Sequence, residues 1–202
     1  MANTLAPNGF ALAGFLDGRN GSLGQSQWQI QTGYTSNIFT NDPVYLTSGY
    51  VTVGASSNST PVLGVFIGCE FYSSAVGRKI WSPYWPASTA VPTGTTIDAW
   101  VITDPQATFK VQANNTSALA ISTLNGSYGY AGQGTTGAAP SSQQLSGQSV
   151  AYLDTVSGAN SGYPFRLLSF VTAPPGANGT DTTSAYQNVI VAFNNQQYRV
   201  NA

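Results

Sequence analysis

Short apolar runs of β type are the feature that most restricts the fold of this chain. No segment keeps a helical apolar period over the length of an ordinary helix, whereas runs rich in Val, Ile, Tyr and Phe recur between Gly, Pro, Asn and Asp. Such runs, bounded by turn residues, are typical of β-strands. Examples are Val62–Tyr72, Thr96–Ile102 and Phe165–Val171. We therefore predict an all-β fold: a compact β-barrel or β-sandwich with an extended N-terminal arm.

The expected strands are distributed unevenly along the chain. Residues 1–27 carry isolated apolar side chains among Gly, Asn and Ser, which predicts an extended arm that packs on another surface. Residues 28–124 are expected to form the barrel core, and residues 38–112 within them contain the densest strand pattern. Residues 125–149, rich in Gly, Ser, Thr and Gln, are typical of a loop. Residues 150–202 supply further strands, which either pack on the core or form a second lobe.

A shortage of charge restricts the partners. The 202 residues include 6 Lys and Arg and 7 Asp and Glu, so charged residues make up 6% of the chain, against about 25% in ordinary soluble domains. Six scattered cations cannot form a phosphate-binding stripe, and no basic amphipathic or long apolar segment suits a lipid bilayer. We expect neither a nucleic-acid nor a membrane partner. The N-terminal sequence lacks the pattern of a signal peptide, which predicts a protein made in the cytoplasm and not secreted by that route.

Catalytic and metal-binding side chains are scarce. The chain has no histidine and one cysteine, Cys69, which excludes His-dependent triads, His-based metal sites and sulfur-rich zinc sites. The pattern around Cys69 predicts a small buried core residue. The "GQGTTG" motif at Gly132–Gly137 matches a dinucleotide-binding fingerprint, but Pro140 stands where the helix of that motif would run. We expect no catalytic residue, no metal and no cofactor.

Two Asp-Pro pairs, Asp42-Pro43 and Asp104-Pro105, lie between β-type segments. Asp98 and Asp104 raise the possibility of a glycosidase-like pair, which requires two carboxyl groups roughly 5–10 Å apart. Proline, however, fixes φ, and a preceding Asp can accept hydrogen bonds from nearby backbone amides. We interpret both pairs as turns that precede strands.

The segment "IWSPYWPAS" at Ile80–Ser88 gathers Trp81, Tyr84 and Trp85 around two prolines. Trp and Tyr are common at binding hot spots and also fill cores. The segment is therefore a core plug, a protein interface or a sugar-stacking platform, and the sequence leaves these three interpretations open.

Four stretches together resemble a family of tailed-bacteriophage capsid cement (head decoration) proteins. They are "MANTLAPNGFALAGFLDG", "YTSNIFTNDPVYLTSGYV", "PVLGVFIGCEFY" and "DAWVITDPQATFKVQ", and the resemblance extends over roughly residues 1–112. The chain departs from the family pattern at Asn41, where a Gly is expected, and at Thr103, where a second Asp is expected.

The resemblance implies a structural virion protein on the capsid exterior. Such a protein binds the major capsid protein lattice and itself, as a homo-oligomer with a trimer favoured over a dimer, and stabilises the phage head. The alternative is a tail or fibre-type virion module that binds host glycans through aromatic side chains. The candidate capsid or self-association contacts are Leu5, Phe10, Phe15, Trp28, Trp81, Tyr84 and Trp85.

Overall fold

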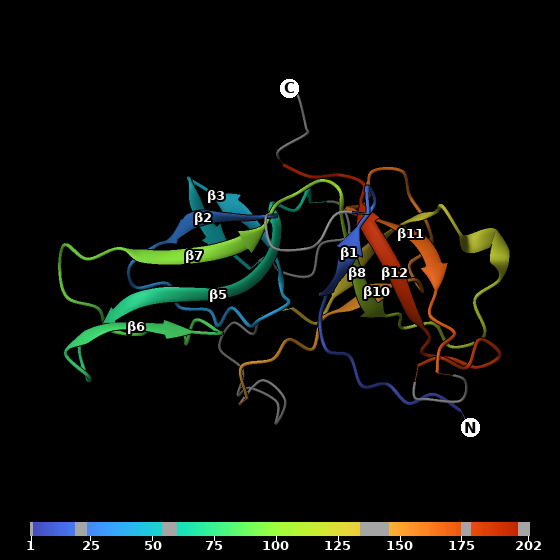
Figure 1. The fold of residues 1–202 in the computed structure, drawn as a ribbon, viewed down its shortest axis with the longest axis horizontal. Helices are drawn as coiled ribbons and strands as arrows, with labels where there is room; N and C mark the ends of the chain where they lie inside the picture. The colour runs from blue at the N-terminus through green and yellow to red at the C-terminus, as the bar shows by residue number, and fades with distance from the viewer. Residues whose placement is uncertain (1, 19–23, 54–59, 134–145, 175–178, 198–202) are drawn as a thin grey trace.

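The described part of the protein is built from antiparallel β-strands (Figure 1). The computed structural model describes residues 2–18, 24–53, 60–133, 146–174 and 179–197. Its elements are β1 (Ala11–Phe15), β2 (Gln25–Ile30), β3 (Pro43–Thr47), β4 (Tyr50–Thr52), β5 (Gly64–Ser73), β6 (Arg78–Ser82), β7 (Ile97–Ile102), β8 (Ala107–Gln112), the 3-10 helix η1 (Ile121–Thr123), β9 (Ser127–Ala131), β10 (Tyr152–Asp154), β11 (Phe165–Phe170) and β12 (Asn188–Phe193). The predicted all-β fold is confirmed.

One sheet forms the lobe on the left of Figure 1, which we call the insert lobe (residues 24–103). Its strand order is β2-β7-β5-β3-β4, and β6 pairs with β5 at the side of this path. The sheet curls until β2 contacts β4, so it approaches a closed barrel. Its inward face buries one apolar cluster that includes Phe66, Phe71, Trp85 and Val101.

The second sheet forms the base lobe on the right, with the order β1-β8-β12-β11-β9-β10 (Figure 1). A parallel bridge between Ala113 and Leu153 brings β10 back beside the end of β8. The core of this lobe is aromatic: the rings of Phe10 and Phe165 stack with centroids 4.3 Å apart, and the Phe109 ring meets the Phe193 ring edge-on at 5.0 Å.

The insert lobe is inserted between two neighbouring strands of the base lobe. β1 and β8 are antiparallel partners, with Phe15 opposite Ala107. The Leu16 amide donates to the Gln106 carbonyl at 2.9 Å, and the Thr103 amide donates to the Gly24 carbonyl at 3.0 Å. The chain therefore enters and leaves the insert lobe through adjacent segments.

This topology differs from the expected division of the chain. Residues 28–124 do not form one barrel, because β8 belongs to the base lobe together with the C-terminal strands. Residues 127–131, expected within a Gly/Ser-rich loop, form β9, whose side chains alternate into the base-lobe core. Residues 134–145 of that loop lie outside the described residues, as does most of the "GQGTTG" motif.

The N-terminal segment is fixed to the base lobe. Residues 2–10 have no regular secondary structure, but residues 11–15 of the expected arm form edge strand β1. The Asn3 amide group donates to the Asp181 and Ala185 carbonyls, both at 2.9 Å, and the Gln112 side-chain oxygen accepts from the Ala6 amide at 2.7 Å. The arm is therefore part of the folded unit.

The two Asp-Pro turns differ in environment. Asp42 is fully buried where the lobes meet: its Oδ2 accepts from the Phe39 amide at 2.8 Å, and its Oδ1 accepts from the Ser149 hydroxyl at 2.5 Å. Asp104 is half-buried and accepts from the Gln106 amide at 2.8 Å, directly before β8. Both are turns, as interpreted from the sequence, and the Asp42 turn also joins the lobes.

Further contacts complete this interlobe junction, which we define as residues 9–10, 39–42, 147–151 and 196–197. Gly9 and Phe10 donate backbone hydrogen bonds to the Ala151 and Asn41 carbonyls, respectively. Gly9 has φ +69°, and a Cβ placed there would lie 2.6 Å from the Asn41 Cβ. The buried Gln196 side chain donates to the Leu63 and Thr103 carbonyls. At Gly9, the positive φ and the close approach of Asn41 therefore require a glycine.

Candidate functional site

The seven candidate contact residues separate by burial. Phe10, Phe15 and Trp85 belong to the two cores and are at most 8% exposed. Their burial leaves them unavailable as contacts of the folded chain. Phe10 and Phe15 are isolated aromatic residues in a polar segment, which gave no indication of which side chains turn inward, whereas Trp85 fits the core-plug interpretation of its segment. Leu5 and Trp81 are the exposed members of the set, at 50% and 55%.

The aromatic segment 80–88 is divided between core and surface. Trp85 fills the insert-lobe core and meets the Phe71 ring edge-on at 5.1 Å. Tyr84 is half-buried and stacks with Phe39 at a centroid distance of 6.1 Å. Trp28 packs partly on the same core, and its indole nitrogen donates to the Ser26 hydroxyl at 2.8 Å. Trp85 therefore fills the core, as the core-plug interpretation has it, whereas Trp81 of the same segment is exposed on the surface.

The carboxylates do not form the pair considered for glycosidase chemistry. Asp98 lies within β7 and Asp104 in the turn beyond it, so roughly 20 Å of extended chain separates them at about 3.3 Å per residue. Asp98 instead lies opposite Glu70 on β5, and the Lys79 amine lies 3.1 Å from Asp98 Oδ2 and 3.2 Å from Glu70 Oε2. Hydrogen bonding to Asp98 and Glu70 raises the pKa of Lys79. The three side chains form an ion-pair cluster.

Other site chemistry can be assessed for the described residues. Among them no group of three or more His, Cys, Asp or Glu side chains lies close enough to hold a metal ion. In the same part of the chain, no helix has the length and apolar character to cross a membrane. Cys69 is buried, as the sequence predicts, and burial raises the pKa of its thiol to about 12. The thiol is therefore not a ready nucleophile.

A surface with apolar and polar parts follows the N-terminal segment. Leu5, Leu12 and Leu16 are between 36% and 50% exposed. β1 pairs with β8 only as far as Ala11 opposite Lys110, and beyond this point the N-terminal segment leaves the strand to enter the junction. We call these leucines and the adjoining pocket the N-terminal surface.

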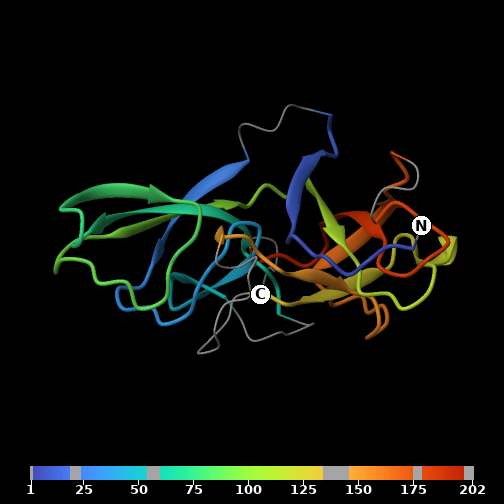
Figure 2. The same ribbon diagram turned by 90° about the horizontal axis from the view of Figure 1, so that it is seen from below.

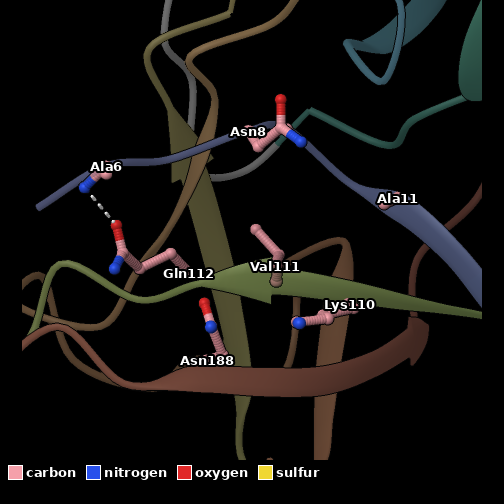
Figure 3. Close-up of a pocket in the computed structure, with 8 residues that line it drawn as sticks. Ala6, Asn8, Ala11, Lys110, Val111, Gln112 and Asn188 are labelled. Atoms are coloured by element: carbon pink, nitrogen blue, oxygen red, sulfur yellow. Dashed lines mark hydrogen bonds between the residues drawn. The ribbon is translucent and has the colours of Figure 1, made fainter. Parts of the chain in front are cut away.

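The divergence of the N-terminal segment from β8 opens a polar pocket of about 240 Å³. Figure 3 shows the segment crossing above β8, with Gln112 closing one end through its hydrogen bond to Ala6. Lys110 lies farther along β8, Asn188 stands opposite Gln112 on β12, and Asn8 lies at the top of the view. A pocket with one amine and three side-chain amides offers hydrogen bonds to a polar group of a partner, with little charge.

A second exposed site lies on the outer face of the insert lobe and includes Trp100, which was not among the predicted contact residues. The Trp100 and Trp81 rings meet edge-on with centroids 5.4 Å apart. Trp100 stands on β7 between two core residues, Ala99 and Val101, so strand alternation directs it outward. The alternation of side chains along β7 could have indicated that Trp100 lies on the surface, but only once it is known which residues of β7 face inward.

Comparisons of the chain with models of protein families, with curated proteins and with solved structures found no match.

Proposed function

We propose that this protein is a capsid cement protein, which binds the outer surface of a major capsid protein lattice and stabilises the phage head. Two kinds of support are available. The sequence resembles that family over roughly residues 1–112, and the N-terminal surface presents exposed leucines on a segment that is already fixed to its own lobe.

The fixed N-terminal surface is the observation that carries the proposal. A surface that is ordered before binding loses little conformational entropy when a partner covers it. Leu5, Leu12 and Leu16 offer apolar area, while the pocket beside Lys110 and Gln112 offers hydrogen bonds. Interfaces of this composition depend little on salt, because few charges take part.

A protein that clamps neighbouring capsid subunits also requires a firm connection between its own two lobes, which the junction provides. Backbone bonds, the buried Asp42 carboxylate and the buried Gln196 amide connect the lobes, so a load on one lobe passes to the other. Many copies on one lattice would add avidity to a modest affinity per copy. We further propose that the protein acts as a homo-oligomer, with a trimer favoured over a dimer.

Purified protein mixed with undecorated phage heads tests the proposal. We expect it to sediment with the heads and to raise their melting temperature, and Leu16→Glu should weaken this attachment at least tenfold. Val156→Glu is the matched control, since Val156 is 63% exposed on the base lobe and is not among the residues of the N-terminal surface. Failure to bind heads, or equal weakening by both substitutions, would reject the proposal. A mass measurement in solution tests the trimer separately.

A further inference from the structure

The outer face of the insert lobe presents a tryptophan platform, which we define as Trp81 and Trp100 with Gly68 beneath them. The strands β2, β7, β5 and β6 lie side by side across this lobe (Figure 1). Trp100 is opposite both Gln27 and Gly68, and Trp81 is opposite Glu70. The inward residues of the same strands, such as Phe71 and Val101, fill the core. The platform therefore lies on the solvent side of the sheet.

The absence of a side chain at Gly68 leaves the space on the sheet that the Trp81 indole occupies. A Cβ at Gly68 would lie 2.3 Å from Trp81 Cζ2 and 2.6 Å from Cη2. The ring therefore leans across the glycine toward Trp100, which it meets at an interplanar angle of 69°. Trp81 nevertheless remains 55% exposed, so a large part of the indole is open to a ligand.

The surroundings of the platform are polar. Gln27 and Gln29 stand on β2 with exposed side chains, opposite Trp100 and Asp98. Glu70, Lys79 and Asp98 form the ion-pair cluster on the next row of the sheet, with a summed charge of −1. The exposed Trp81 ring and the half-buried Trp100 ring are thus bordered by groups that both donate and accept hydrogen bonds.

We propose that this platform binds a neutral oligosaccharide of gluco-configured pyranose units. A pyranose with equatorial hydroxyls has apolar C–H faces and a rim of hydroxyl groups, which match an exposed indole bordered by amides and carboxylates. The negative charge of the ion-pair cluster disfavours uronic acids and other acidic sugars. Because the rings lie on an open sheet face, the site suits an internal segment of a polymer. The site is independent of the capsid proposal and of the N-terminal surface.

Titration of the protein's tryptophan fluorescence with cellohexaose and chitohexaose tests this inference. We expect a saturable change with at least one of these two neutral ligands and none with an acidic oligoguluronate of equal length. Trp81→Ala and Trp100→Ala should each weaken binding at least tenfold. Ile121→Ala, which truncates an apolar side chain 79% exposed on the base lobe, should leave binding unchanged.

Gly68→Ala tests whether sugar binding requires the position of the Trp81 ring as well as its presence. It retains both tryptophans but displaces the Trp81 indole, so affinity should fall. The same Cβ would lie 2.9 Å from the Ser82 carbonyl oxygen, so the melting temperature should fall as well, and affinity is measured at a temperature where far-ultraviolet circular dichroism shows the variant folded. If Trp100→Ala fails to fold, Gly68→Ala still tests the role of the platform in sugar binding.

Several results would overturn the inference. They are no fluorescence change with either neutral hexasaccharide at millimolar concentration, binding of the acidic oligomer alone, or neutral-sugar binding that persists in Trp81→Ala. If Trp81→Ala instead weakens attachment to heads or changes the solution mass while sugars have no effect, the platform is a protein contact.

Discussion

Replacing the two Asp-Pro aspartates separately should reveal their different roles. Asp42→Ala removes a carboxylate with two buried hydrogen bonds, from the Phe39 amide and the Ser149 hydroxyl. Hydrogen bonds to charged groups contribute roughly 1.5–3 kcal/mol each, so the expected loss of unfolding free energy is about 3–6 kcal/mol. Asp104→Ala removes the hydrogen bond that a half-buried carboxylate accepts from the Gln106 amide; because solvent screens this carboxylate, only about 0.5–1.5 kcal/mol is expected.

Urea unfolding followed by tryptophan fluorescence and near-ultraviolet circular dichroism measures both losses. Both variants retain their prolines, so the comparison isolates the side-chain oxygens. Asp42→Asn should fall between wild type and Asp42→Ala, because an amide retains one acceptor oxygen. Since whole domains are stable by only about 5–15 kcal/mol, the Asp42 loss should be readily measurable. Equal losses at the two positions, or an Asp42→Ala loss below about 1 kcal/mol, would refute the role assigned to the junction.

Three further predictions follow from buried or paired side chains. Phe10→Ala should reduce the unfolding free energy by about 3–5 kcal/mol, because the ring stacks on Phe165 within the base-lobe core; denaturant titration measures this, and a change typical of a surface site would contradict it. The Cys69 thiol should not react with a disulfide reagent at pH 8 until the protein unfolds, because its pKa is raised to about 12; rapid labelling of the folded protein would be inconsistent with its burial. Lys79 stabilises the fold below the ordinary lysine pKa, and this contribution is lost as pH rises through its raised folded-state pKa. The difference in melting temperature between wild type and Lys79→Met should therefore shrink toward high pH, and a constant difference would argue against the ion pairs.

The sequence predicted the fold class because short β-type runs and turn residues are local signals. The turns at Asp42 and Asp104 were predictable for the same reason, since proline and the preceding side chain act within a few residues. The segment 127–131 was missed as a strand because its glycine and tyrosines occur within a composition typical of loops. Its pairing with β10 and β11 is long-range and outweighs local propensity.

The N-terminal arm and the contact residues show a different limit of sequence reasoning. Residues 11–15 become a strand because β8, almost a hundred positions later, offers an edge. The same long-range pairing buries Phe15, while Phe10 enters the base-lobe core beside the junction. Deleting residues 1–27 should therefore destabilise the base lobe, and would not test surface attachment alone. Trp100 was missed as a surface residue because the inward face of β7 is set by its neighbours.

The position of the insert lobe suggests which part of the protein can be exchanged for another module. Its first and last residues lie beside each other at Gly24 and Thr103, so a module with adjacent ends fits the same gap between β1 and β8 without altering their pairing. Further constraints come from Phe10, which donates to the Asn41 carbonyl, and from the segments around Gly147 and Gln196, which return from the base lobe to bind the insert. A replacement module would need a donor for the Gly147 carbonyl and acceptors for the Gln196 side-chain amide. The base lobe can thus keep its structure while the insert lobe is exchanged, and the exchange can alter what the protein binds.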